Sequence, residues 1–284
     1  MRKFILTLNK RFGTEVPALL GFLALVLIVF SLTAPRFLSA ANLGSMAFQL
    51  PELGLLTLAM LVPIISGGFN LAIIYTANMA GLTLAWVLLQ YGGVDASPWA
   101  FALGVVLALG VGALSGAIMG FVIAYIGAHP ILVSLAMMIF LRGLGEFLTR
   151  GGDISGFPDY LSVIGHGSFV GIPVPLLLFL AAALVWHLML TRTRHGFAVY
   201  MIGSNIRASD YAGLHTKRTL TLIYTFSGMI CAVAGILMLT RFNSVRVGHG
   251  EALMLITVLA CFLGGVDPFG GFGRVVPVVI ALVI

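Results

Sequence analysis

TRTRHGFAVYMIGSNIRASDYAGLHTKR, residues 191–218, is the stretch that decides the fold, because a long apolar run lies on each side of it. The runs 173–190 and 219–240 approach the roughly 20 mostly apolar residues that a helix needs to cross a bilayer. The segment between them carries five basic residues against one acid, Asp210. A long, basic, glycine-punctuated connection of this kind is typical of the cytoplasmic side of a membrane protein, and it favours contact with a soluble partner.

The composition of the whole chain also indicates a membrane protein. Of the 284 residues, 60% are hydrophobic and 8% are charged, whereas soluble domains carry about 25% charged residues. The net charge of +6 comes from basic residues in predicted loops, so topology and lipid headgroups account for it and nucleic acid is not an expected partner. Cys231 and Cys261 lie far apart in apolar runs, a spacing that predicts neither a disulfide nor a metal site.

The apolar runs predict the fold class. We expect an all-α polytopic membrane protein, with residues 1–284 forming a single transmembrane domain of about nine to ten helices. Pro51 and Pro63 fall within the second run, so we expect a kinked or broken second helix. The last run begins at Val275 and supplies only half a span, so we expect an incomplete C-terminal helix. The expected full spans are 16–33, 43–65, 71–91, 99–126, 131–148, 173–190, 219–240 and 252–264.

Lysine and arginine residues predict how the spans are oriented, because short cytoplasmic loops carry an excess of them. With the N-terminus inside, ten fall on the cytoplasmic side: Arg2, Lys3, Lys10, Arg11, Arg192, Arg194, Arg207, Lys217, Arg218 and Arg274. Four fall outside: Arg36, Arg150, Arg241 and Arg246. This bias predicts a cytoplasmic N-terminus, a cytoplasmic loop at 191–218 and an outside loop at 149–172.

A polar segment interrupts the apolar pattern between the second and third runs. It reads SGGFNL at 66–71, and its paired glycines end a helix and leave backbone polar groups free. Uncharged amides and hydroxyls inside a span suit a neutral polyhydroxylated solute, but they serve equally well as hydrogen-bond partners between helices. We predict that the solute pathway is lined by Ser66, Phe69, Asn70, Thr76 and Asn78, with interhelical bonding as an equally weighted alternative.

Two further patterns predict helix packing. A row of small residues spaced by four lets another helix approach closely, as GxxxG patterns do: Gly104, Ala108, Gly112, Gly116, Gly120 and Ala124. Arg142 and Glu146 lie four apart on one helix face and can form an ion pair. Ionisable groups within a span are costly and often functional, but we interpret this pair as a structural one near the outer end of its helix.

The basic segment has the markers of a short helix. Ser204 or Asn205 can cap its start and Gly213 can end it. A helix of about two turns is marginal in water, so we expect the membrane domain or a partner to hold it. A solvated basic loop that touches anionic membrane lipid is the alternative.

Motifs for catalysis are absent from the sequence. It contains no GxxxxGK[ST] phosphate-binding loop, no HExxH, no GxSxG and no Cys/His cluster. We therefore expect a chain that is not an enzyme, and any ATP that drives it must be hydrolysed on another chain.

Several ordered motifs resemble one protein family. They are SGGFNL at 66–71, GAIMGFVIAYIGAHPILVSLAMMIFLRGLG at 116–145, MIGSNIRASDYAGL at 201–214, YTFSGMICAVAGILMLTR at 224–241 and FLGGVDPFGGFGR at 262–274. This order, spread over roughly residues 40–280, resembles the permease subunits of bacterial ABC importers for monosaccharides, the ribose, galactose and xylose type. The resemblance implies a bundle of about ten helices of the type II importer kind.

The resemblance also implies partners. It predicts a second permease subunit, identical or homologous, two cytoplasmic ATPase subunits and a periplasmic solute-binding protein that would meet 149–172. The ATPase would hold ATP and Mg, and this chain would bind no cofactor itself. The expected location is the bacterial inner membrane.

The resemblance identifies 203–214 as the segment that docks in a groove of the ATPase. Glycines would allow a sharp entry and exit, and small alanines would allow close docking. The expected coupling residues are Gly203, Asn205, Ala208, Tyr211, Ala212, Gly213 and Leu214. The chain departs from the family at Asn70, where an aspartate is common, and this removes a charge from the polar segment.

We therefore expect a translocation subunit of an ATP-driven importer for a sugar or similar small polar solute, with alternating access powered elsewhere. The alternative is an ion-coupled secondary transporter or a facilitator. Ion coupling usually needs intramembrane carboxylates, and Glu52 and Glu146 are the candidates within the predicted spans.

Overall fold

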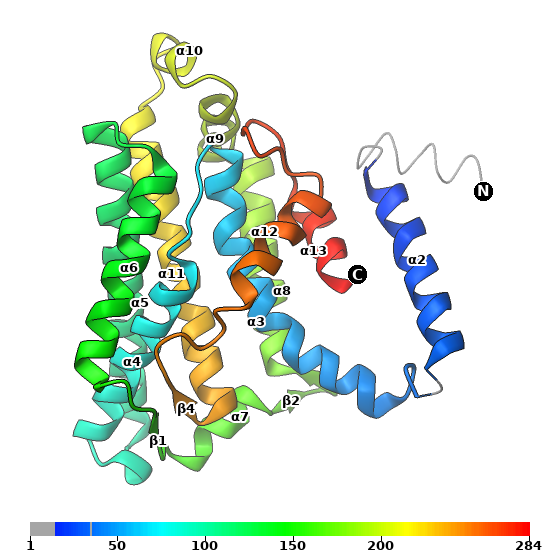
Figure 1. The fold of residues 1–284 in the computed structure, drawn as a ribbon, viewed down its shortest axis with the longest axis vertical. Helices are drawn as coiled ribbons and strands as arrows, with labels where there is room; N and C mark the ends of the chain where they lie inside the picture. The colour runs from blue at the N-terminus through cyan, green and yellow to red at the C-terminus, as the bar shows by residue number, and fades with distance from the viewer. Residues whose placement is uncertain (1–14, 35) are drawn as a thin grey trace.

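The protein is a bundle of helices in the computed structural model, which describes residues 15–34 and 36–284 (Figure 1). The long helices are α2 (Glu15–Thr33), α3 (Ala40–Ile65), α4 (Ile73–Gln90), α5 (Pro98–Phe121), α6 (Pro130–Thr149), α8 (Val174–Arg192) and α11 (Thr216–Phe242). The shorter ones are α7 (Ser162–Gly165), α9 (Arg194–Ser204), α10 (Ile206–Tyr211), α12 (Leu253–Leu263) and α13 (Val275–Val283), with η1 (Gly93–Asp95), η2 (Val122–Ile126) and η3 (Asp159–Leu161).

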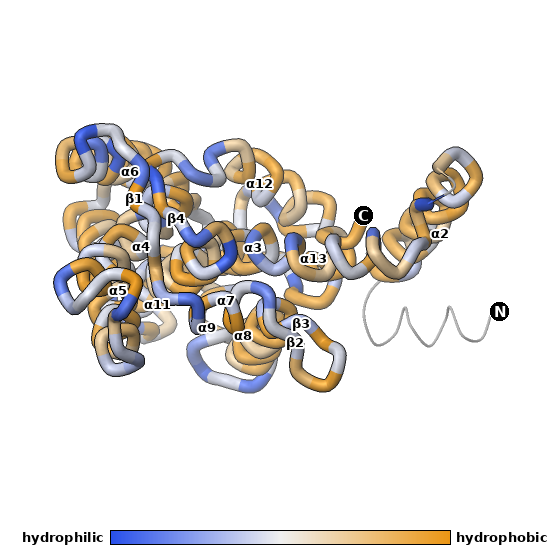
Figure 2. The backbone as a smooth tube through the Cα atoms, turned by 90° about the horizontal axis from the view of Figure 1, so that it is seen from below, coloured by the Kyte–Doolittle hydropathy of each residue, from blue (hydrophilic) through white to orange (hydrophobic). Residues whose placement is uncertain are grey.

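The seven long helices are the candidate membrane spans of the described residues, by length and apolar composition. Their bounds agree with the expected runs to within a few residues, so the polytopic helical class is confirmed. Figure 2 shows hydrophobic residues along most of the helices, with hydrophilic ones gathered near their ends. α12 has 11 residues and α13 has 9, both shorter than a span, so the total of nine to ten spans stays a prediction.

The helices run between two opposite ends of the bundle (Figure 1). We call them the α10 end, which carries α9 and α10, and the α7 end. At the α7 end four two-residue strands form two antiparallel pairs, a departure from the all-α expectation: β1 (Ile154–Ser155) with β4 (Ser244–Val245), and β2 (Ser168–Phe169) with β3 (Ile172–Pro173). The β1–β4 pair ties segment 149–172 to the chain that follows α11.

Helix α3 is kinked and not broken, which decides between the two alternatives for the second helix. It runs without interruption from Ala40 to Ile65 with Pro51 and Pro63 inside it. Figure 1 shows α3 changing direction between its N-terminal part and the rest, so the helix bends and does not break. Proline removes one backbone hydrogen bond and crowds the preceding turn, which bends a helix, and packing of the buried C-terminal part against its neighbours keeps it helical.

The centre of the bundle is α11, which packs against α3, α4 and α5. The row of small residues on α5 makes this contact possible, as the sequence predicted. A Cβ on Gly112 would overlap the carbonyl oxygen of Gly228, and one on Gly116 would overlap that of Tyr224. Glycine therefore allows the two backbones to touch directly, the way small residues bring helices together in lipid.

The basic residues divide between the two ends. Among the described residues, the α10 end carries Arg192, Arg194, Arg207, Lys217, Arg218 and Arg274. The α7 end carries Arg36, Arg150, Arg241 and Arg246. The other four residues of the expected inside set, Arg2, Lys3, Lys10 and Arg11, lie outside the described residues, and the cytoplasmic N-terminus stays a prediction.

Candidate functional site

Helix α10 stands out from the α10 end as a short element with its own caps (Figure 1). The side chain of Asn205 accepts a hydrogen bond from the Ala208 N–H at 3.0 Å, which makes Asn205 the N-cap. The Ser209 hydroxyl donates to the Asn205 carbonyl at 2.9 Å, and Ser209 is buried. The cap satisfies one of the free N–H groups that otherwise make so short a helix unstable.

The C-terminal end of α10 closes in a Schellman motif. Gly213 has φ 79°, the left-handed conformation that glycine adopts without strain. Its N–H donates to the Asp210 carbonyl at 3.0 Å, and the Leu214 N–H donates to the Ser209 carbonyl at 3.1 Å. The hydroxyl of Thr216, at the start of α11, donates to the carboxylate of Asp210 and fastens the turn to the long helix.

The outer surface of α10 is free of contacts within the subunit. Tyr211 is 94% exposed, and Ala208, Ala212 and Gly213 are also exposed. Tyrosine is enriched at protein interfaces, so an almost fully exposed Tyr211 favours a protein contact. The geometry thus provides a preformed, rigidly held surface on an otherwise membrane-embedded chain.

Gly203 has a different role from the one that the sequence suggested. We expected it to allow a sharp entry into the segment, as Gly213 allows the exit. Instead it lies within α9, where a Cβ would overlap the carbonyl oxygen of Ile65 and lie 2.5 Å from the Gly271 nitrogen. Gly203 is therefore required for close approach of three backbones, and no turn forms there.

Three segments meet at this point. The N–H of Gly271 donates to the Ile65 carbonyl at 2.8 Å, at the end of α3. A Cβ on Gly270 would lie 2.7 Å from the Gly67 backbone. Nearby, the Tyr200 hydroxyl of α9 donates to the Gly273 carbonyl at 2.7 Å. The motif at 262–274 was recognised in the sequence without a role, and the structure places it against the base of α9–α10.

An open cavity of about 610 Å³ lies beside this contact. It brings together one predicted pathway residue and two predicted coupling residues, namely Ser66, Gly203 and Asn205. His129 and Arg207 also line it, from two different connections at the α10 end. The cavity thus lies between the polar segment and the coupling segment, and the sequence did not predict that the two adjoin.

Asn70 is buried and its side chain is bonded within the subunit. It has 0% of its surface exposed; its amide nitrogen donates to the Ser227 hydroxyl at 2.8 Å and its oxygen accepts from the Ala72 N–H at 3.1 Å. Ser227 in turn donates to the Ala59 carbonyl at 2.6 Å. Asn70 therefore links the polar segment to α11 and α3, and this geometry favours the interhelical alternative at this position.

The other predicted pathway residues lie in separate surroundings. Phe69 is half-buried and packs edge-on against Phe262 of α12, with ring centroids 6.3 Å apart. Thr76 is buried, and its hydroxyl has no hydrogen-bond partner among the described residues. Asn78 is buried, and with its amide turned to satisfy both groups it pairs with the His249 carbonyl at 3.1 Å and the Gly248 N–H at 2.9 Å. The lining of a pathway by these residues stays a prediction.

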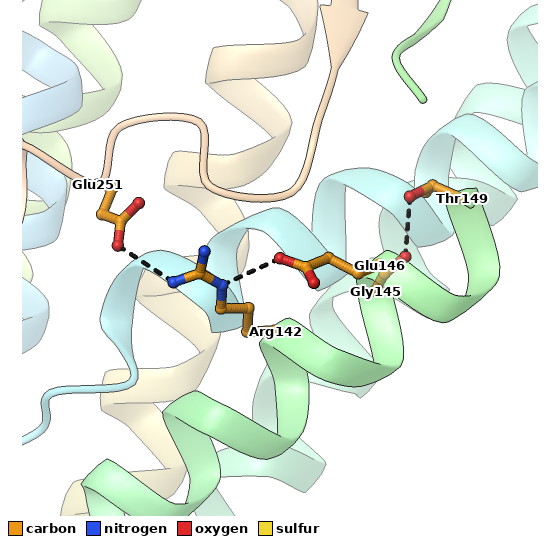
Figure 3. A network of polar contacts seen from close by, with 5 residues as sticks. All are labelled: Arg142, Gly145, Glu146, Thr149 and Glu251. Carbon is orange, nitrogen blue, oxygen red and sulfur yellow. Dashed lines mark hydrogen bonds and ion pairs between the residues drawn. The ribbon is translucent and has the colours of Figure 1, made fainter. Parts of the chain in front are cut away.

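The predicted ion pair has a third member (Figure 3). The Arg142 Nε lies 3.0 Å from the Glu146 Oε1, and its Nη1 lies 3.5 Å from the Glu251 Oε1. All three side chains are about half exposed. Glu251 comes from the connection before α12, so the cluster joins α6 to that connection, and no local spacing in the sequence could have indicated it.

A second ion pair was missed by sequence reasoning. Glu52 of α3 pairs with Arg241 at the end of α11, and the Glu52 Oε1 lies 3.3 Å from the Arg241 Nε. Both are largely buried. The sequence analysis named Glu52 as a carboxylate within a span and Arg241 as a cation on the outside, and did not pair them, because no periodic pattern connects positions so far apart.

Metal-binding clusters do not occur in residues 15–34 and 36–284: no group of three or more His, Cys, Asp or Glu side chains is arranged to hold an ion. Cys231 and Cys261 are both buried and free.

Known proteins match almost the whole chain. A family described as "Branched-chain amino acid transport system / permease component" matches residues 42–284. The chain is similar to the Autoinducer 2 import system permease protein LsrD of Salmonella typhi, with 30% identity over 94% of this chain and 80% of that one. The protein of the same name from Yersinia enterocolitica is 30% identical over 98% of this chain and 84% of its own length. That of Photorhabdus temperata is 28% identical over 98% of this chain and 83% of its own length. No solved structure matches the chain significantly.

Proposed function

This chain belongs to the family of branched-chain amino acid transport system permease components, and from that premise we propose that it is the translocation subunit of an ATP-driven importer. The named relatives are permeases of autoinducer 2 import systems. Together with the motifs that resemble monosaccharide permeases, these names favour a sugar or a similar small polar solute as the cargo. Autoinducer 2 is the first compound to try.

The observation that carries this proposal is the capped, exposed helix α10. A transport subunit without its own phosphate-binding loop needs a rigid surface through which another chain can move it. The segment from Gly203 to Leu214 has that character, because both helix ends are closed and Tyr211 projects from it. We assign this surface to the groove of a cytoplasmic ATPase subunit, which would hold ATP and Mg.

The contacts at the base of α10 supply a route for the motion. A displacement of α10 moves α9, because Asn205 directly joins the two helices. Gly203 of α9 touches the Ile65 carbonyl, and the polar segment that follows Ile65 is bonded to α11 through Asn70. Backbone contacts without intervening side chains transmit displacement with little loss, so docking at α10 would bias the arrangement of α3 and α11.

The remaining partners follow from the same proposal. The α10 end would face the cytoplasm, with the N-terminus on the same side, and segment 149–172 at the α7 end would face a periplasmic binding protein. A second permease subunit, identical or homologous, would complete the pathway in the bacterial inner membrane. The chain binds no cofactor in this scheme, and membrane lipid contacts its exposed apolar helix faces.

Co-purification and uptake together test the proposal. The chain, tagged and expressed with its neighbouring genes, should retain an untagged ATPase, and vesicles containing the complex and the binding protein should take up radiolabelled solute only when ATP is enclosed. The matched control replaces ATP by ADP. Uptake that persists without ATP and collapses when a proton or sodium gradient is dissipated would instead support the ion-coupled alternative.

A further inference from the structure

A second cavity, of about 480 Å³, opens between α3, the end of α11, the connection that leads into α12 and the end of α13. It lies toward the α7 end, away from the cavity beside α10. Its polar lining comes from Gln49, Glu52, Arg241 and His249, and its apolar lining includes Phe242 and Leu253. Four polar side chains of different chemistry around one cavity are unusual in a bundle with 8% charged residues.

The Glu52–Arg241 pair in this cavity is incompletely bonded. The side chains are 6% and 15% exposed, and the Arg241 Nη1 donates to the Phe48 carbonyl at 3.1 Å. The Glu52 Oε1, although 3.3 Å from the Arg241 Nε, is buried and has no hydrogen-bond partner among the described residues. Burying a carboxylate oxygen without a donor is costly, so such an atom is expected to have a partner that is supplied from elsewhere.

The missing hydrogen bond is specific to the Glu52–Arg241 pair, as a comparison with the Arg142–Glu146 pair shows. That pair is half exposed and joined by a hydrogen bond of 3.0 Å, so water and its partner satisfy both charges. Both pairs are formed by an arginine and a glutamate of transmembrane helices, and only the buried one has a carboxylate oxygen that lacks a hydrogen-bond partner among the described residues.

The rest of the cavity suits a ring-shaped polar molecule. His249 stacks on Phe242 with ring centroids 4.4 Å apart, and the Arg241 guanidinium lies 4.7 Å from the Phe242 ring centroid. Burial and the neighbouring Arg246 lower the pKa of His249, so its imidazole is neutral and offers one donor and one acceptor. Gln49 adds an exposed amide with both functions.

We propose that this cavity is a binding site for a small, neutral, polyhydroxylated solute, where Glu52 accepts a hydroxyl hydrogen bond and Arg241, Gln49 and His249 complete the polar contacts. A hydroxyl is both donor and acceptor, so one solute in the cavity can donate to the Glu52 carboxylate when that side chain turns toward it, and can accept from the Arg241 guanidinium. A charged solute fits less well, because the pair is already neutral overall. The inference rests on the proposed import function and adds a site, toward the α7 end, where the solute is held after it leaves the binding protein.

Thiol protection tests the site directly. In the complete transport complex, reconstituted in nanodiscs, Met46→Cys places a reactive thiol in the lining of the cavity and keeps all four polar side chains of the proposed site, and its rate of labelling by a water-soluble maleimide is measured. Ser97→Cys, exposed in the connection before α5 and outside segment 149–172, is the matched control. The probes are D-ribose, D-xylose, D-galactose and autoinducer 2, and the compound that the wild-type complex takes up is used for protection.

The transported compound should slow labelling of Met46→Cys and leave labelling of Ser97→Cys unaffected. Adding Glu52→Gln should raise the concentration that protects half of the thiol by about tenfold or more, since a hydrogen bond to a charged acceptor is lost. Adding Glu146→Gln, which neutralises a carboxylate of the exposed pair, should leave that concentration unchanged. This comparison separates loss of binding from a general effect of charge removal.

Three outcomes would overturn the inference. If uptake is intact but the compound does not protect Met46→Cys at saturation, the cavity is not a solute site and the proposed import function still stands. Equal protection in the presence and absence of the Glu52 carboxylate would remove that residue from the site. If none of the four probes is taken up with ATP, the proposed sugar-type import fails, and this inference fails with it.

Discussion

Asn205 and Asn70 each accept a hydrogen bond from a backbone N–H near the start of a helix, but they lie in very different surroundings. The Asn205 bond, to Ala208, is on the exposed surface of the α10 end. The Asn70 bond, to Ala72, is fully buried, and the other half of the Asn70 amide is held by Ser227. Both asparagines belong to glycine-rich segments, and from the sequence alone both segments are equally good candidates for a functional surface.

The difference teaches that a polar residue in a membrane protein is available for function only when its own bonding leaves it free. At α10 the internal bonds close the helix ends, and the outward face of the segment remains for a partner. At Asn70 the internal bonds occupy both the nitrogen and the oxygen of the amide, and this favours a structural role for the side chain. We therefore assign the coupling role to residues 203–214, and treat the polar segment as the link between that surface and the core.

Among the substitutions that test this comparison, Gly203→Val is expected to have the largest effect on stability and on ATPase activity. Its side chain must displace the carbonyl oxygen of Ile65 and the backbone of Gly271, so the contact between the two regions opens. We expect a loss of about 3 kcal/mol or more in stability, seen as a lower midpoint of thermal unfolding in detergent, together with loss of solute-stimulated ATPase activity.

Gly213→Ala is the matched control for that substitution. Gly213 has open space around it but φ 79°, so alanine adds only the strain of a left-handed backbone, about 1 kcal/mol, confined to the end of α10. Equal thermal midpoints for the two variants would refute the close-contact explanation of Gly203.

Asn70→Leu is expected to have the next largest effect. Leucine keeps the branched shape but leaves the buried Ala72 N–H without its acceptor, at a cost of about 1–3 kcal/mol in stability. Uptake per assembled complex should stay within about twofold of wild type, because the partners lost are structural. An assembled, thermally normal variant that no longer transports would return Asn70 to the solute pathway.

Asn205→Ala is expected to act more locally. It removes the N-cap of α10, worth about 1 kcal/mol, and so frays a helix that is too short to be stable alone. Solute-stimulated ATPase activity should fall severalfold while the thermal midpoint of the membrane domain stays within error. Asn205→Asp, which caps equally well, should restore the stimulation; a failure of both variants alike would point to a direct contact and not to a cap.

The sequence predicted the helices well because apolar length is a strong local signal. The seven long helices follow their runs closely, and the small-residue row on α5 identified the face that touches α11. Of the two alternatives for the second helix, the kink is observed and the break is not, because proline costs only one hydrogen bond and the buried surroundings of Pro51 keep the helix intact. The β1–β4 pair could not be predicted, since two-residue strands carry no periodicity.

The candidate site was predictable only where its chemistry is local. The cap at Asn205 and the stop at Gly213 follow from residue type and position. The close approach of Gly203 to Ile65 and the pairing of Glu52 with Arg241 join residues that are far apart in the sequence. Such contacts depend on the packing of whole helices, and a single sequence carries no direct signal for them.

The central claim, that residues 203–214 dock an ATPase subunit, is tested most directly by photocrosslinking from position 211. With p-benzoylphenylalanine in place of Tyr211, irradiation of membranes that contain the assembled complex should attach the ATPase to this chain. The same amino acid in place of Phe169, an aromatic residue exposed at the opposite end, is the matched control and should give no ATPase adduct. An assembled, ATP-driven complex that yields no adduct from position 211, or yields one from position 169 instead, would contradict the account.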